Sequence, residues 1–127
     1  MENTRPARVG SYEVLEDFTS RAASVRLLRL GESDAVEPHL HRRSTQIYVS
    51  LSGVSVITLD GRDELLPPYA MVEVPPETAH SARCEEGRSM LLNISVPPLA
   101  ADDQLPLSSQ PYRVDLELPR NALDVDD

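Results

Sequence analysis

Apolar and polar residues alternate in short runs through the middle of the chain, and turn residues separate the runs. Six runs have this strand-like pattern: 23–30, 46–51, 54–59, 71–74, 80–84 and 89–96. The pair Asp60-Gly61 between two of them is typical of a two-residue β-hairpin turn. Short strands with turns every 8–12 residues or so predict an all-β sandwich or barrel. No helical periodicity of useful length is visible.

The two ends of the chain lack this pattern. Residues 1–10 are polar, and 99–110 (LAADDQLPLSSQ) resemble a linker or surface loop. Beyond them, apolar and acidic residues alternate over 114–118, which predicts an edge strand packed on a partner subunit, and the final DVDD is expected to be disordered. We therefore expect one domain over 1–127, with a core at about 12–98 and a C-terminal extension at 99–127.

Amino-acid composition excludes some classes of protein. The 127 residues suit one domain, and 40% are hydrophobic, enough for one modest core. The formal net charge of −9 disfavours binding to nucleic acid or to anionic membrane surfaces. No apolar run approaches the ~18 residues of a membrane span, and the N-terminus lacks a signal-peptide core. With Cys84 as the single cysteine, the sequence predicts a soluble cytoplasmic protein.

The three histidines form the most informative group. In a strand, residues i and i+2 share a face, so His39 and His41 point the same way. Gln46 opens the next predicted strand, and His80 follows another one. Imidazole suits Zn, Mn, Fe, Ni or Cu. An HxH pair alone is equally compatible with surface or core histidines, but a barrel could bring all three histidines and the glutamine together.

These residues resemble the motifs of the cupin superfamily over residues 25–98. The first motif reads Gly31 upstream, His39-Leu40-His41, four residues, Gln46, six residues and Gly53; the second ends in Pro75-Pro76-Glu77-Thr78-Ala79-His80. The resemblance implies a single-domain cupin, a double-stranded β-helix with a jelly-roll-like barrel. It also implies one divalent transition metal (Zn, Mn, Ni or Fe) held by His39, His41, Gln46 and His80.

The chain departs from the cupin motifs at five positions. Tyr69 and Glu77 stand where the motifs have glycine, so we expect those turns to be built differently. Ala70 replaces a common aspartate, and Cys84 replaces a common asparagine. Gln46 replaces the usual glutamate ligand.

A glutamine ligand changes the expected chemistry. Its carbonyl oxygen can bind a metal but brings no charge, which leaves a divalent ion more positive and a better Lewis acid. This favours non-redox chemistry. Cupins with this ligand set resemble sugar-processing and lyase-type enzymes, including small proteins that act on unsaturated uronates. Those enzymes place an acid, an aromatic residue and an arginine around the last strand. Residues 93–99 contain none of the three, so the resemblance does not supply the substrate.

Four further residues are candidates for the pocket. Tyr48 shares a strand face with Gln46 and could act as a general acid, or it could be a core aromatic. Asn93 and Ser95 would line the last strand as substrate-binding residues, or form an ordinary hydrated interior. Arg26 could bind a substrate carboxylate, although exposure on the surface is the simpler interpretation.

Three functions fit this pattern. The first is a metal-dependent lyase, isomerase or cyclase acting on a small polar, carbohydrate-like or oxygenated substrate. The second is a dioxygenase that uses Fe(II) and oxygen, and the third is a non-catalytic small-molecule-binding module. The resemblance also implies a homodimer formed through residues 11–30 and 112–118.

Overall fold

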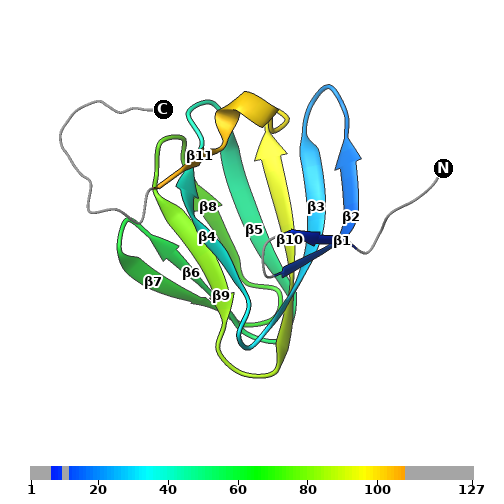
Figure 1. The fold of residues 1–127 in the computed structure, drawn as a ribbon, viewed down its shortest axis with the longest axis vertical. Coiled ribbons are helices and arrows are strands. Elements are labelled where there is room, and N and C mark those ends of the chain that lie inside the picture. The colour runs from blue at the N-terminus through cyan, green and yellow to red at the C-terminus, as the bar shows by residue number, and fades with distance from the viewer. Residues whose placement is uncertain (1–6, 10–11, 108–127) are drawn as a thin grey trace.

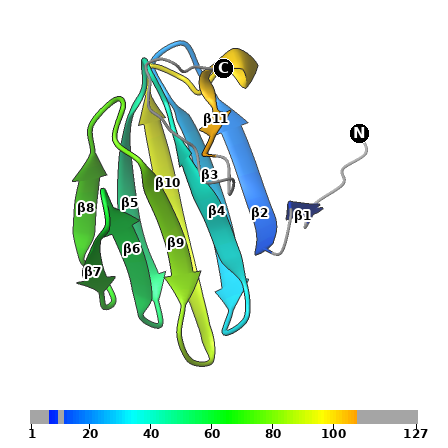
Figure 2. The same ribbon diagram turned by 60° about the vertical axis from the view of Figure 1, so that its left-hand side comes forward.

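A computed structural model describes residues 7–9 and 12–107, which form two antiparallel sheets packed face to face (Figures 1 and 2). The first sheet has the order β1 (Ala7–Val9), β2 (Tyr12–Thr19), β3 (Ser24–Gly31), β10 (Arg88–Val96), β5 (Thr45–Ser52) and β8 (Met71–Val74). The second has the order β11 (Leu105–Pro106), β4 (Ala35–Leu40), β9 (His80–Cys84), β6 (Ser55–Leu59) and β7 (Arg62–Leu66). The all-β prediction is confirmed. No helix in the described part of the chain is long and apolar enough to cross a membrane.

Alternation along the strands decides what lies between the sheets. In β10, Leu91, Asn93 and Ser95 are buried, while Leu92 and Ile94 between them are half-buried on the outer face. The same alternation makes the inward-facing side chains of β5 buried. All six predicted strands occur, with ends shifted by one residue at most.

The hairpin between β6 and β7 forms as predicted. Asp60 and Gly61 have φ angles of 48° and 85°, the pair of positive values that a type I′ turn requires. Gly53 is required for a second reason, close approach: a Cβ atom added there would lie 2.1 Å from the carbonyl oxygen of Arg88. Only glycine fits this contact between the β5–β6 turn and β10.

The turns at Tyr69 and Glu77 are not built differently, and that expectation is wrong. Tyr69 has φ 74° and Glu77 has φ 65°, so both residues adopt the left-handed conformation that glycine favours. Backbone hydrogen bonds hold them there: Tyr69 N donates to the Ser50 carbonyl at 2.7 Å, and Glu77 N donates to the His41 carbonyl at 2.6 Å. Tertiary contacts therefore override the local preference of a non-glycine residue.

The segment that follows β10 is not a simple linker. Residues 99–107, which we call the C-terminal strap, contain a short 3₁₀ helix (Ala101–Asp103) and then β11, which pairs with β4. In Figure 1 the strap lies at the upper end of the sandwich, where β4 ends and β5 begins; we call this end the open end. The edge strand predicted around 114–118 and the DVDD tail lie outside the described residues.

Candidate metal centre

Three histidines and a glutamine meet at one end of the sandwich, between the two sheets. His39 lies in β4, His41 directly after it, Gln46 in β5 and His80 at the start of β9. All four side chains are buried. The histidine rings each offer a ligand nitrogen, and these atoms lie within 4.8 Å of one another. His41 is not itself in a strand, so the HxH pair converges across the end of β4.

Hydrogen bonds to the backbone fix the tautomer of each histidine. Each ring places Nδ1 against a carbonyl oxygen: His39 against Glu37 O at 2.6 Å, His41 against Asp103 O at 2.7 Å, and His80 against Thr78 O at 2.9 Å. Because a carbonyl oxygen only accepts, each Nδ1 carries the proton and each Nε2 keeps its lone pair. This is the form in which imidazole binds a metal.

The three rings are uncharged at neutral pH. Burial, together with the neighbouring histidines, lowers the pKa of His39 to about 3 and that of His80 to about 4. Burial also lowers the pKa of His41, although the Asp103 carbonyl and carboxylate oppose this effect. A cation can therefore bind without first displacing a proton from the rings.

Two contacts indicate that a cation fits between these side chains. His41 Nε2 is buried without a hydrogen-bond partner. His80 Nε2 lies 2.9 Å from Gln46 Oε1, and in the tautomer described above both atoms are acceptors. Two facing lone pairs and one orphaned lone pair are costly in a buried site unless a positive ion lies among them. The donor set of imidazole nitrogens and one amide oxygen suits a divalent transition metal.

Asn93 and Ser95 orient the glutamine. The Gln46 amide nitrogen donates to Asn93 Oδ1 at 3.0 Å and to Ser95 Oγ at 2.9 Å, which turns its carbonyl oxygen toward His80. Asn93 Nδ2 is buried without a hydrogen-bond partner, so the amide group of Asn93 uses only its acceptor end in this arrangement. Asn93 also lines the inner part of the pocket, whereas the contact of Ser95 is with Gln46.

Tyr48 lies beside the histidines. It is buried, and its ring centroid is 6.1 Å from that of His80. Burial raises the pKa of its hydroxyl, with a further contribution from Tyr12. Tyr48 therefore remains a protonated phenol, able to donate a hydrogen bond but poor as a base.

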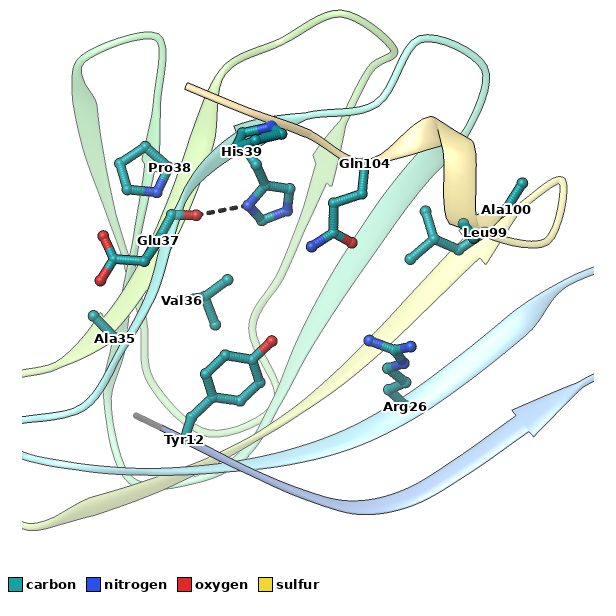
Figure 3. Close-up of a pocket in the computed structure, with 12 residues that line it drawn as sticks. Tyr12, Arg26, Ala35, Val36, Glu37, Pro38, His39, Leu99, Ala100 and Gln104 are labelled. Carbon is teal, nitrogen blue, oxygen red and sulfur yellow. Dashed lines mark hydrogen bonds between the residues drawn. The ribbon is translucent and has the colours of Figure 1, made fainter. Parts of the chain in front are cut away.

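A pocket of about 740 Å³ leads from the surface to His39. Figure 3 shows the side chains of Tyr12, Arg26 and Gln104 directed into it. A narrow inner extension of about 20 Å³ reaches Gln46 and Tyr48. Arg26, half-buried, lies 3.4 Å from the Asp17 carboxylate through Nε. Of the four predicted ligands, His39 and Gln46 line this space together with Arg26, while His41 and His80 lie behind them.

Sequence reasoning missed part of this pocket wall. Tyr12 and Gln104 come from segments that carry no motif, and Asp103 lies in the stretch expected to be a linker. The strap supplies one side of the pocket through Leu99, Ala100 and Gln104. The sequence of the strap is acidic and has no periodicity, so it gave no local indication that the strap forms part of the pocket.

Comparison with known proteins supports the fold. The sequence matches no protein-family model and no curated protein. Among solved structures, it is similar to the TT1209 protein from Thermus thermophilus, with a TM-score of 0.67 and 26% identity over 75% of this chain and 93% of that one. An RmlC-like cupin from Shewanella frigidimarina gives 0.65 and 19% over 74% and 82%. KdgF from a Halomonas species gives 0.63 and 20% over 72% and 83%.

Sheet order, ligand geometry and structural neighbours agree with one another. The two facing sheets match those of cupins and double-stranded β-helix proteins. His39, His41 and His80 cluster at the open end with Gln46, as the ligands of a cupin metal site do. The chain has the cupin fold, with a three-histidine, one-glutamine site.

Proposed function

We propose that this protein is a metal-dependent cupin enzyme that acts on a small, polar, oxygenated organic substrate by lyase, isomerase or cyclase chemistry. The observation that carries the proposal is the uncharged donor set, two members of which, His39 and Gln46, line the pocket. Three neutral imidazoles and an amide leave a divalent ion with its full charge. Such a site favours Lewis-acid chemistry over the stabilisation of higher oxidation states.

The metal would be held by His39, His41, His80 and Gln46. When bound, it would supply polarisation of a substrate carbonyl or hydroxyl. Tyr48, a protonated phenol beside His80, would donate a hydrogen bond or a proton to the polarised group. Ser95 and Asn93 would keep the Gln46 carbonyl turned toward the site.

The pocket indicates the kind of substrate. Its volume of about 740 Å³ lies in the range of small-molecule sites. The wall is largely apolar, with polar groups from Tyr12, Arg26 and Gln104. Arg26 is the one arginine among the described residues that line it, and it would bind a carboxylate or another anionic group of the substrate. A compact organic anion bearing hydroxyl or carbonyl groups fits this arrangement.

Metal replacement tests the proposed chemistry. Metal-free protein is reconstituted separately with Zn(II), Mn(II), Ni(II) and Fe(II), and each form is assayed without oxygen on a panel of hydroxy and keto acids. We expect turnover with redox-inert Zn(II) in the absence of oxygen. Activity that requires both Fe(II) and oxygen would instead show a dioxygenase, and binding without turnover of any compound would show a binding module.

We also propose a homodimer. On the outer face of the first sheet, half-buried apolar side chains align across three strands: Val25, Ile94 and Ile47 in one row, and Leu27, Leu92 and Val49 in the next. A second copy packed on this face would remove these rows from water. Sedimentation equilibrium at micromolar concentration tests this, and a monomer would contradict it.

A further inference from the structure

We propose that Asp103 is a positioning residue for the metal centre: its carboxylate locks the loop between two ligands, and its carbonyl orients His41. The inference rests on the proposed metal site. It assigns to the C-terminal strap a role in the chemistry of a site whose four ligands all lie in the core of the fold.

The Asp103 carboxylate binds three consecutive backbone amides. Its Oδ1 accepts from Arg42 N at 2.7 Å, while Oδ2 accepts from Arg43 N at 3.1 Å and from Ser44 N at 3.2 Å. The side chain is 1% exposed. These amides belong to the loop that joins His41 to β5, and therefore to Gln46. One buried carboxylate thus fixes the spacing between two proposed ligands.

The Asp103 carbonyl holds one of those ligands directly. It accepts a hydrogen bond from His41 Nδ1 at 2.7 Å, across 62 positions of sequence. This bond sets the tautomer that leaves the His41 Nε2 lone pair buried and unpartnered. The carbonyl of Asp103 cannot shift without moving its carboxylate, which binds the amides of the loop. The hydrogen bond to His41 and the hydrogen bonds to the loop therefore stabilise each other.

The strap is anchored on both sides of Asp103. On one side, Leu99 N donates to Ser24 Oγ of β3 at 2.9 Å. On the other, β11 pairs with β4, with Pro106 opposite His39. The strap therefore touches the elements that carry both histidines of the HxH pair. Because the strap is fixed in this way, its position can determine the positions of the proposed ligands.

Charge gives Asp103 a second effect. Its carboxylate is buried next to a ligand set that has no negative charge of its own, and it favours positive charge at His41. A nearby fixed anion stabilises a bound cation in a site of low dielectric constant. Asp103 would therefore raise the affinity for metal as well as orient the ligand.

The neighbouring aspartate provides a matched control. Asp102 lies in the same 3₁₀ helix, but its side chain is 79% exposed and pairs with the Arg43 side chain at 2.7 Å. Replacement of Asp102 by asparagine changes the net charge by the same amount as replacement of Asp103. It leaves the amides of the loop and the carbonyl at His41 untouched.

The experiment compares Asp103→Asn and Asp103→Ala with Asp102→Asn. Nitrogen-15 NMR of the metal-free protein reports the tautomer of the His41 ring, and competition with a chromophoric chelator gives the affinity for Zn(II). We expect Asp103→Asn to weaken Zn(II) binding by about 10–100-fold and to mix the His41 tautomers, and Asp103→Ala to do more. Asp102→Asn should leave both readouts unchanged.

The outcomes separate this inference from the proposed function. If Asp103→Asn lowers the melting temperature but leaves the tautomer and the Zn(II) affinity as in the wild type, Asp103 is merely structural and the inference fails. If wild-type protein binds no metal, the metal site fails, while the NMR comparison still tests whether Asp103 orients His41. Should Asp103→Ala not fold, the asparagine variant carries the test.

Discussion

The two ends of the sandwich are made from the same strands but differ in their buried side chains: polar ligand groups gather at one end, and apolar residues with a few serines fill the other. In β9, the buried positions run from His80 at the open end to Ala82 and Cys84 at the other. In β10 they run from Ser95 and Asn93 at the open end through Leu91 to Ser89, whose hydroxyl accepts from the Ser55 hydroxyl at 2.8 Å. The backbone alternation is the same throughout, so the difference lies in the residues chosen for the inward positions.

The difference shows what each end is for. At the closed end, fully buried apolar residues such as Leu30, Ile57 and Leu91 fill the space between the sheets. At the open end, His80 Nε2 faces Gln46 Oε1, and His41 Nε2 and Asn93 Nδ2 are buried without a hydrogen-bond partner. Burial of polar groups costs stability unless they are paired. Apolar burial at the closed end stabilises the fold. At the open end, the burial of polar groups lowers the stability of the protein but brings the proposed metal ligands together.

The largest expected effect comes from a cavity at the closed end. Leu91→Ala removes a fully buried side chain, so we expect a loss of about 2–5 kcal/mol in the free energy of unfolding. Urea unfolding measures it, with Leu92→Ala, half-buried on the outer face, as the smaller-effect control. Metal content per folded chain should not change in either variant. A loss of metal in folded Leu91→Ala would show that the two ends are not separable.

A fall in pH should lower the stability of the metal-free protein through the histidines at the open end. The pKa values of His39 and His80 are about 3 and 4 in the folded protein, below the ordinary value of 6.5, so these rings take up protons more readily when unfolded. The stability of the metal-free protein is therefore complete above pH 6.5 and falls as the pH drops toward these values. We expect about 1.4 kcal/mol per pH unit for each such histidine.

Urea unfolding between neutral pH and the folded-state pKa values measures this slope. His80→Ala serves as the control, because it removes one of the titrating rings and should make the slope shallower. A wild-type stability that stays flat between pH 6.5 and about 5 would contradict the buried, neutral state of the histidines.

The smallest expected effect concerns the strained turn at Tyr69, between β7 and β8. Tyr69 is exposed and adopts φ 74°, so Tyr69→Gly should relieve the left-handed strain and stabilise the protein by about 1 kcal/mol. Thermal unfolding checks this beside Tyr69→Ala, which keeps a Cβ atom and should bring no gain. If the alanine variant is stabilised as much as the glycine variant, strain is not the cause.

Features of the fold could be predicted from the sequence where residues close together in the chain determine them. Six of the strands and the Asp60-Gly61 hairpin follow from alternation and turn chemistry, which neighbouring residues carry, whereas β1, β2, β4, β7 and β11 were not predicted. The left-handed turns at Tyr69 and Glu77 do not follow from those two residue types, because contacts with distant parts of the chain impose them; the only indication was that the motifs have glycine there. The burial of Asp103 depends on partners 59 to 62 positions away, within an acidic stretch that has no periodicity.

Within the site, the four proposed ligands lie in recognisable motifs, and the structure brings them together. The inward direction of Asn93 and Ser95 also followed from alternation along β10. Their hydrogen bonds to Gln46 depend on the register between β5 and β10, in which Gln46 faces Ser95, and register is not visible in one sequence.

The most direct test of the account is the metal content of the protein, purified without an affinity tag, measured by mass spectrometry beside His80→Ala. We predict about one transition-metal ion per wild-type chain and none in the variant, because His80 supplies one of the three converging nitrogens. Absence of metal from the wild type even after reconstitution would contradict the account, and the histidines would then line a pocket for an organic ligand.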